Sequence, residues 1–101
     1  MRQVIWSREA LSDAADMLRH IATDDANAAH QVIDRIEATG DALGKFATGH
    51  PGRVAGTYEK SVRTLPYIIA YALTADDETV VILRVIHAAR DWREQDWPQD
   101  R

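Results

Sequence analysis

The sequence predicts a small α+β domain in which a pair of N-terminal helices packs on a mainly antiparallel β-sheet, in the order β-α-α-β-β-β-α. Three observations predict it. Apolar residues recur with helical spacing through the first half of the chain, residues 47–56 form a loop rich in glycine, and short apolar runs separated by turn residues fill the second half. A chain of 101 residues has room for one core, so we expect a single domain over residues 1–101.

Two amphipathic helices are expected after a short first strand at residues 3–6. Ser7 is placed to cap the first helix, in which apolar side chains recur every three or four residues: Leu11, Ala14, Leu18 and Ile21. Capping residues at 23–25 interrupt this pattern, and a second one runs from Ala29 to Phe46 with Gly40 inside it, where the helix either continues or breaks. Helices joined so closely fold back on each other as an αα-hairpin.

Three strands and a short helix are expected in the second half. Residues 57–62 form a weak strand near an edge of the sheet, because only two of their side chains are large and apolar. Residues 67–74 and 79–87 form a hairpin around 75–78, and its second strand is apolar enough to be central and covered on both faces. A helical piece at residues 90–95 closes the fold.

The register of this hairpin decides which side chains enter the core. If Thr74 opposes Thr79, one face carries the better core candidates: Tyr67, Ile69, Tyr71, Leu73, Val80, Ile82, Arg84 and Ile86. The other face is shallower and awaits another element or a partner: Ile68, Ala70, Ala72, Val81, Leu83, Val85 and His87. A slip of one residue would exchange the two faces.

Composition excludes several classes of function. The chain has no cysteine, which removes disulfides, thiolate nucleophiles and cysteine-based metal sites. The four histidines form no helical i, i+4 pair, and there is no phosphate-binding or dinucleotide-binding glycine motif, so we expect neither metal nor cofactor. A formal charge of −4 opposes broad attraction to a phosphate backbone. With no signal peptide and no apolar run of membrane length, we expect a cytoplasmic protein that does not contact membranes.

One polar group could carry chemistry. His87, Arg84, Arg63 and Arg90 could meet at one end of the sheet, and a histidine beside guanidinium groups suits acid/base work on a phosphate. The simpler interpretation is structural, with His87 and Arg90 bonded to the backbone or to Asp91 and fixing the strand-to-helix corner.

Three stretches resemble the RelE/ParE superfamily of toxins from type II toxin–antitoxin modules. They are GRVAGT at residues 52–57, LPYIIAY at 65–71 and ILRVIHAARDW at 82–92, and together with the element order the resemblance covers nearly the whole chain. The last stretch is the most specific, and its His-x-x-Arg-Asp ending is more similar to ParE members than to RelE members. The resemblance implies a RelE/ParE-like fold.

The superfamily holds two functions on one fold, so the fold alone does not choose between them. RelE-like members cut messenger RNA on the ribosome with a set of lysines and arginines. Where that set would stand, this sequence has Glu59, Ser61, Ile68 and Ala88, and only His87 matches the histidine of one branch. The resemblance therefore implies a ParE-like toxin that inhibits DNA gyrase by binding. The alternatives are a ribosome-dependent ribonuclease using His87 with Arg63, Arg84 or Arg90, and a degenerate, non-toxic member.

The partner that the resemblance implies is a cognate antitoxin, with which the toxin would form a hetero-oligomer. Candidate contact residues for the antitoxin or the target lie on the helices and at the end of the last strand: Leu11, Leu18, Phe46, Arg84, His87, Arg90, Asp91 and Trp92. The same residues could instead close the core of the monomer.

Overall fold

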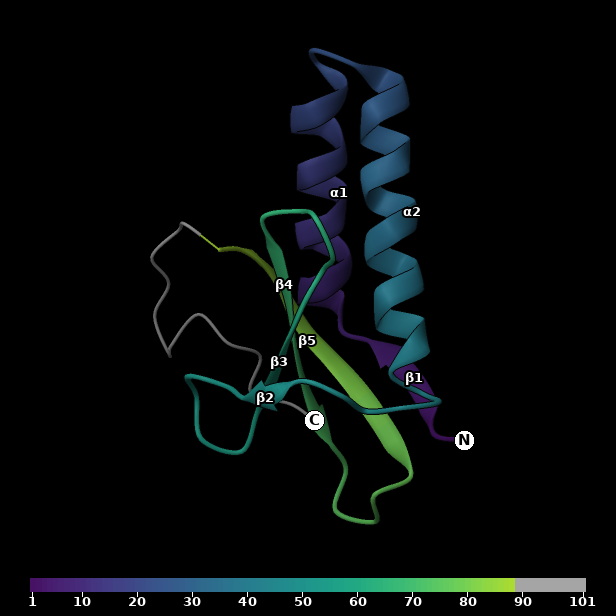
Figure 1. Ribbon diagram of the computed structural model, residues 1–101, viewed down its shortest axis with the longest axis vertical. Helices are drawn as coiled ribbons and strands as arrows, with labels where there is room; N and C mark the ends of the chain where they lie inside the picture. Colours follow the sequence, from purple (N-terminus) through teal and green to yellow (C-terminus); the bar gives the residue numbers. More distant parts are fainter. Residues whose placement is uncertain (89–101) are drawn as a thin grey trace.

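The computed structural model describes residues 1–88. The helix expected at residues 90–95, with Arg90, Asp91 and Trp92, lies outside the described residues. The elements follow the predicted order, with one short strand added (Figure 1): β1 (Gln3–Trp6), α1 (Arg8–Ala22), α2 (Ala26–Ala42), β2 (His50–Pro51), β3 (Tyr58–Ser61), β4 (Tyr67–Leu73) and β5 (Thr79–His87).

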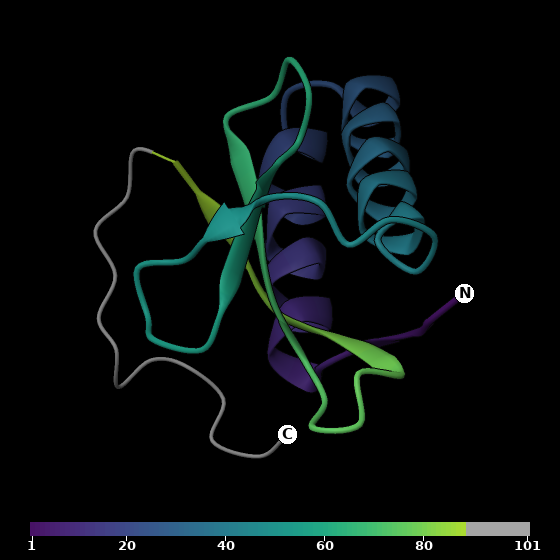
Figure 2. The same cartoon turned by 60° about the horizontal axis from the view of Figure 1, so that its bottom comes forward.

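The five strands form one sheet in the order β1-β5-β4-β3-β2. Only β1 and β5 run parallel, and the other pairs are antiparallel, which confirms the mainly antiparallel sheet. Helix α1 lies against β5 with α2 beside it, so the helical hairpin covers one face of the sheet (Figures 1 and 2). As expected, β5 is a central strand and β3 is near an edge, with only the two-residue β2 outside it.

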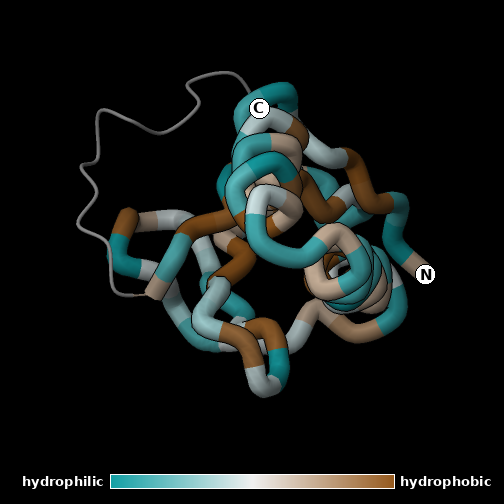
Figure 3. The backbone as a smooth tube through the Cα atoms, turned by 90° about the horizontal axis from the view of Figure 1, so that it is seen from above, coloured by the Kyte–Doolittle hydropathy of each residue, from teal (hydrophilic) through white to brown (hydrophobic). Residues whose placement is uncertain are grey.

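Both predicted helix caps are present. Ser7 Oγ accepts a hydrogen bond from the Ala10 amide at 3.0 Å and donates one to the Leu83 carbonyl at 2.8 Å, so the cap of α1 is also tied to β5. The Asp25 carboxylate accepts from the Ala28 amide at 3.1 Å and starts α2. Viewed down the long axis, hydrophilic and hydrophobic residues alternate along both helices (Figure 3), as their amphipathic patterns predict.

Helix α2 continues through Gly40 and ends at Ala42, whereas the apolar pattern had extended it to Phe46. Gly40 is buried, and the indole of Trp6 packs on it: a Cβ atom there would stand 2.7 Å from Trp6 Cη2. Trp6 Nε1 also donates to Asp41 Oδ1 at 3.1 Å. The absence of a side chain at Gly40 therefore lets β1 pack closely against α2, and the glycine does not break the helix.

The predicted register of the β4–β5 hairpin is correct at the turn and wrong beyond it. Thr74 opposes Thr79, and the Thr74 amide donates to the Thr79 carbonyl at 3.0 Å. A bulge between Ala70 and Tyr71 then shifts the pairing by one residue. Beyond it Ile69 opposes Val85 and Tyr67 opposes His87, where the regular register had placed Arg84 and Ile86.

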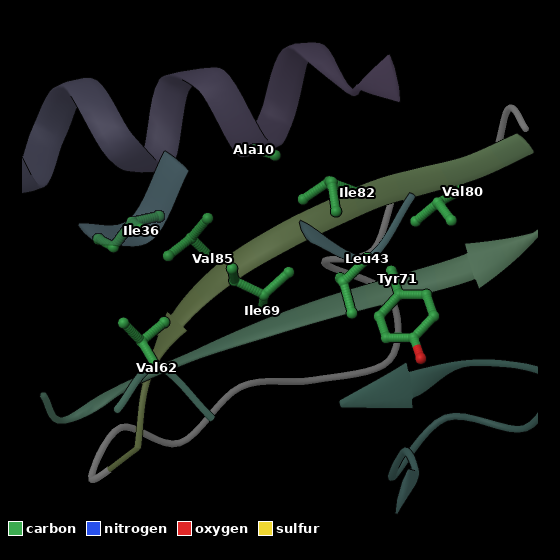
Figure 4. Close-up of a cluster of buried hydrophobic side chains, with 9 residues drawn as sticks. All are labelled: Ala10, Ile36, Leu43, Val62, Ile69, Tyr71, Val80, Ile82 and Val85. Carbon is green, nitrogen blue, oxygen red and sulfur yellow. The ribbon is translucent and has the colours of Figure 1, made fainter. Parts of the chain in front are cut away.

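The bulge changes the composition of the core. Val85, which the regular register placed on the shallow face, is buried with Ile69 in the main cluster under the helices (Figure 4). That cluster consists of Ala10, Ile36, Leu43, Val62, Ile69, Tyr71, Val80, Ile82 and Val85. A smaller cluster on the other face joins Ala70, Ala72 and Leu83 with the partly buried Val54 and Val81. Neither described helix is both long and apolar enough to cross a membrane.

Candidate functional site

The last residues of β5 and the alanine after it, Leu83 to Ala88, form a polar corner that we call the β5 end. Its central contact joins β5 to α1. Arg84 Nε donates to Asp13 Oδ2 at 2.8 Å and Arg84 Nη2 donates to Asp13 Oδ1 at 2.9 Å. The Val85 amide donates to the same Asp13 Oδ2 at 2.9 Å. A bidentate carboxylate–guanidinium pair with a third donor is among the strongest polar contacts a protein makes, so this corner is firmly held.

His87 lies at the same end of the sheet, against the first residue of β4. Its ring stands edge-on to the ring of Tyr67, with centroids 5.4 Å apart and an interplanar angle of 88°. The Ala88 amide donates to the Pro66 carbonyl at 2.8 Å, which closes β5 onto the turn before β4. An aromatic edge-to-face contact fixes the orientation of the imidazole at the surface of the sheet.

Arg63 is exposed in that turn, and helix α2 holds the turn in place. Arg35 Nη1 donates to the Arg63 carbonyl at 3.4 Å and to Thr64 Oγ1. Of the four residues expected to meet, the structure puts His87 and Arg63 at one end of the sheet and directs Arg84 to Asp13. Arg90 lies outside the described residues.

A second polar pair, which the sequence did not predict, lies at the opposite edge of the sheet. Glu59 on β3 is 3% exposed, and its carboxylate accepts from the Arg53 amide at 2.9 Å, from Arg53 Nε at 2.8 Å and from Arg53 Nη2 at 3.0 Å. Burial alone raises the pKa of Glu59, but the hydrogen bonds and charge of Arg53 outweigh it and hold that pKa below its ordinary value. The pair pins the loop before β3.

Tyrosines on β3 and β4 complete this side of the sheet. Tyr58 stacks on Tyr71 with ring centroids 5.5 Å apart, and Tyr71 Oη donates to the Thr48 carbonyl at 2.7 Å. Burial raises the pKa of the Tyr71 phenol, so it stays protonated and acts as a hydrogen-bond donor. Tyr71 is buried in the core, as the sequence predicted, whereas Tyr58 covers its ring and is itself 38% exposed.

Two of the predicted contact residues are apolar and face solvent. Leu11 on α1 is 57% exposed and Phe46, just after α2, is 73% exposed. Leu18 lies seven residues after Leu11, on the same side of α1, and is half-buried. An apolar side chain that faces solvent can anchor a protein–protein contact where the partner offers a pocket that buries it. Among residues 1–88, no group of histidine and acidic side chains is arranged to hold a metal ion.

Asp13 is the residue of this region that sequence reasoning missed. A signal was present, because Asp13 lies four residues before Met17 and next to Ala14, on the inward side of an amphipathic helix. A carboxylate on the inward side of a helix needs a partner, and the single arginine of the otherwise apolar strand at residues 80–86 was the available cation.

These features define a small α+β fold in which a helical hairpin covers one face of a five-stranded sheet. Residues 4–92 match the family model described as ParE toxin of the type II toxin–antitoxin system parDE. The chain belongs to this family and is a toxin of the RelE/ParE superfamily.

Two relatives at the sequence level carry toxin names. The chain is 37% identical over 92 residues to Y4kP of Sinorhizobium fredii, whose name describes it as a candidate toxin, covering 90% of this chain and 93% of the relative. It is 33% identical over 91 residues to toxin RelE2 of Caulobacter vibrioides, covering 89% of this chain and 99% of the relative.

Two solved structures share the fold. A chain of the chromosomal ParDE system from P. aeruginosa superposes with a TM-score of 0.79 at 20% identity, over 86% of this chain and 96% of that one. A chain of the toxin–antitoxin complex RelBE2 from Mycobacterium tuberculosis superposes with a TM-score of 0.61 at 22% identity, over 88% and 93%. Both support the RelE/ParE-like fold, and neither distinguishes gyrase inhibition from RNA cleavage.

Proposed function

We propose that this toxin acts by binding DNA gyrase and blocking its activity, and that a cognate antitoxin neutralises it in a hetero-oligomeric complex. The proposal places the toxin in the cytoplasm, where it would meet gyrase, and involves nucleic acid only through the gyrase it binds. It assigns no catalytic turnover and no cofactor to the chain. The match to a ParE family model over residues 4–92 supports it.

The observation that carries the proposal is how the charged side chains of β3 and β5 are paired. A ribonuclease of the RelE kind needs cations that face the scissile phosphate. At the β3 positions where the resemblance expects lysines stand Glu59, which is buried against Arg53, and Ser61. Arg84, on β5, has its guanidinium fork on the Asp13 carboxylate. Binding is the activity that such a surface supports best.

The antitoxin-binding surface is proposed to lie on the helical hairpin. Leu11 and Leu18 form one stripe of α1, and Phe46 stands beyond the end of α2. The charged and aromatic residues proposed for contact with the antitoxin or with gyrase lie at the β5 end and after it: Arg84, His87, Arg90, Asp91 and Trp92. The two solved structures described above come from toxin–antitoxin systems, which supports an antitoxin partner for this chain.

A supercoiling assay tests the proposed target. Purified toxin should inhibit supercoiling of relaxed plasmid by gyrase in proportion to its concentration, and the antitoxin encoded beside it should restore supercoiling. The matched control is topoisomerase I relaxation of the same plasmid, which should be unaffected. Gyrase activity that is untouched at toxin doses that arrest growth would contradict the proposal.

A ribosome-dependent messenger ribonuclease is the second candidate, and the 33% identity to a protein named toxin RelE2 favours it. It would use His87, held against Tyr67, with Arg63, Arg84 or Arg90 in phosphate-binding roles. Sequencing of RNA ends after induction decides between the two activities. Cleavage at fixed codon positions that disappears in His87→Ala would establish the ribonuclease, whereas unchanged RNA with inhibited gyrase would exclude it. Normal growth without antitoxin would identify a degenerate member.

A further inference from the structure

Strand β5 has different neighbours along its two edges. Strand β4 accompanies it from Val80 to His87, but β1 pairs with it only as far as Ile82. From Leu83 onward the edge of β5 that faced β1 lies beside the start of α1 instead (Figure 1). A backbone that outruns its neighbouring strand carries N–H and C=O groups that need other partners.

Two side chains of the α1 region supply these partners. Ser7 Oγ donates to the Leu83 carbonyl at 2.8 Å, and the Asp13 carboxylate accepts from the Val85 amide at 2.9 Å. The two contacts are made by β5 residues that lie two positions apart. Backbone groups that point to the same edge of a strand have this spacing. Ser7 and Asp13 thus continue, with side chains, the pairing that β1 began.

The Asp13 contact coincides with the bulge that sets the register of the β5 end. Without the bulge, Arg84 would oppose Ile69 and its guanidinium would enter the apolar cluster under the helices. With it, Val85 takes that place and His87 meets Tyr67. The Asp13 carboxylate bonds the amide of Val85 and the guanidinium of Arg84 at once, and its side chain is only 14% exposed. The bulged register is therefore the one in which both groups are satisfied.

We infer that Asp13 is a positioning residue that fixes the bulged register of β5 and so decides on which face of the sheet Val85 and His87 lie. The β5 end of the toxin is then held by α1 and does not depend on strand pairing alone. Nothing in this inference requires gyrase to be the target. Its consequence for toxicity rests on the proposed function only in that the β5 end belongs to the surface by which the toxin acts.

The test compares two carboxylates of the same helix in the full-length protein. Asp13→Ala removes the acceptor of Val85 and Arg84. Asp16→Asn changes an exposed carboxylate whose partner is Arg19, three residues along α1, and it serves as the matched control. The readouts are the cross-strand NOE between the Tyr67 and His87 rings and the hydrogen exchange of the Val85 amide.

In Asp13→Ala the ring NOE should disappear and the Val85 amide should exchange roughly 100-fold faster, as expected on loss of a charge-assisted hydrogen bond. Asp16→Asn should retain both wild-type values. A folded Asp13→Ala protein with the ring NOE and the exchange rate of wild type would overturn the inference, because the strands alone would then set the register.

If Asp13→Ala does not fold, Asp13→Asn takes its place. The neutral Asn side chain has one acceptor oxygen and an NH2 group that would face a donor of Arg84, so the charge-assisted bonds of the carboxylate are lost and the Val85 amide should exchange at least about tenfold faster than in wild type. Wild-type exchange in Asp13→Asn would overturn the inference. Growth arrest without antitoxin, at matched soluble protein, tests the consequence: it should weaken in the Asp13 variants and persist in Asp16→Asn. Full arrest by a variant that has lost the ring NOE would show that toxicity does not depend on the β5 end.

Discussion

Glu59 shows how one buried carboxylate is kept charged in this fold. It is almost fully enclosed, yet the backbone amide and the guanidinium of Arg53 together give it three hydrogen bonds. Removing one partner of such a pair leaves the other desolvated without compensation. The pair is therefore expected to stabilise the loop between β2 and β3 mainly because losing either partner would leave the charge of the other desolvated and uncompensated.

Glu59→Gln tests the pair through the pH dependence of stability. Because Arg53 holds the pKa of Glu59 below its ordinary value of 4.5, the carboxylate stabilises the fold above that pH, and this contribution is lost as the pH falls through the pKa of the folded state. At pH 7 the variant should lose about 1–3 kcal/mol in the free energy of unfolding. The difference from wild type should shrink as the pH falls below 4.5.

Urea unfolding at pH 7 and at pH 3 measures this difference. Glu37→Gln, on the exposed side of α2, is the control and should be near wild type at both pH values. A Glu59→Gln deficit that is equal at the two pH values would mean that the charge of Glu59 does not contribute, and that its effect comes from packing.

At the scale of single residues the sequence predicted the local chemistry well and the long-range chemistry poorly. The cap Ser7 and a cap among residues 23–25, which the structure places at Asp25, could be identified because a capping side chain bonds an amide three residues away. The Arg84–Asp13 pair spans 71 positions, and no local pattern joins its members. The Arg53–Glu59 pair spans only six positions, but alternation placed Glu59 on a weak strand without showing that the loop would fold back over it.

The packing of β1 on α2 depends on a glycine inside a helix. Glycine at such a position ordinarily costs about 1 kcal/mol relative to alanine. Here the Trp6 indole occupies the space where a Cβ atom of residue 40 would lie, and Asp41 accepts its N–H. The packing of the indole on Gly40 stabilises the fold by more than the low helix propensity of glycine costs. Helix α2 is therefore continuous through Gly40, where the sequence allowed either a continuous helix or a break.

Gly40→Ala is therefore expected to destabilise the protein, against the usual sign for a helix interior. The new methyl group would meet a rigid ring, and overpacking of this kind costs roughly 1–3 kcal/mol. Thermal or urea unfolding of the purified variant measures the loss. A more stable Gly40→Ala protein would contradict the close packing of Trp6 on α2.

A double-mutant cycle separates this clash from other effects of the alanine. Trp6→Phe removes the part of the indole that would collide with residue 40. In the Trp6→Phe background, Gly40→Ala should therefore cost much less, or stabilise the protein through helix propensity. Equal costs in the two backgrounds would place the strain elsewhere.

Apart from the two-residue β2, the order and the type of the described elements could be predicted because each has its own periodicity, caps or turn residues. The register beyond the hairpin turn could not be predicted, because a bulge adds one residue to a strand and the alternation of apolar side chains does not reveal it. Val85 and Ile86 are both apolar, so either could be assigned to the core from the sequence. The observed choice depends on Asp13, which belongs to a different element.

At the scale of the whole molecule, the described surface has the features that the proposed binding function requires. Arg53 pairs with Glu59 on one side of the sheet, and Arg84 pairs with Asp13 on the other. Large apolar side chains on α1 and after α2 face solvent. The sequence predicted these apolar residues as contact candidates from the resemblance. It could not show which of them the monomer would bury, and the structure leaves Leu11 and Phe46 exposed while it half-buries Leu18.

The proposed antitoxin surface on α1 predicts that Leu11→Asp weakens the complex. Leu11 is 57% exposed, so its loss should change the free energy of unfolding of the isolated toxin by less than about 1 kcal/mol. An apolar anchor buried in the complex and replaced by a charge should raise the Kd for the antitoxin at least roughly tenfold. Titration calorimetry with the antitoxin encoded beside the toxin measures the change.

Ser12→Asp is the matched control, because it adds the same charge at the next position of α1, also exposed but one residue, about 100°, around the helix. Its Kd should stay within a few-fold of wild type, since long-range charge effects on a surface are screened over roughly 10 Å at ordinary salt. If both variants weaken binding equally, the loss is electrostatic and Leu11 is not an anchor. If neither does, the antitoxin binds away from the outer stripe of α1, and Phe46 and the β5 end become the surfaces to test.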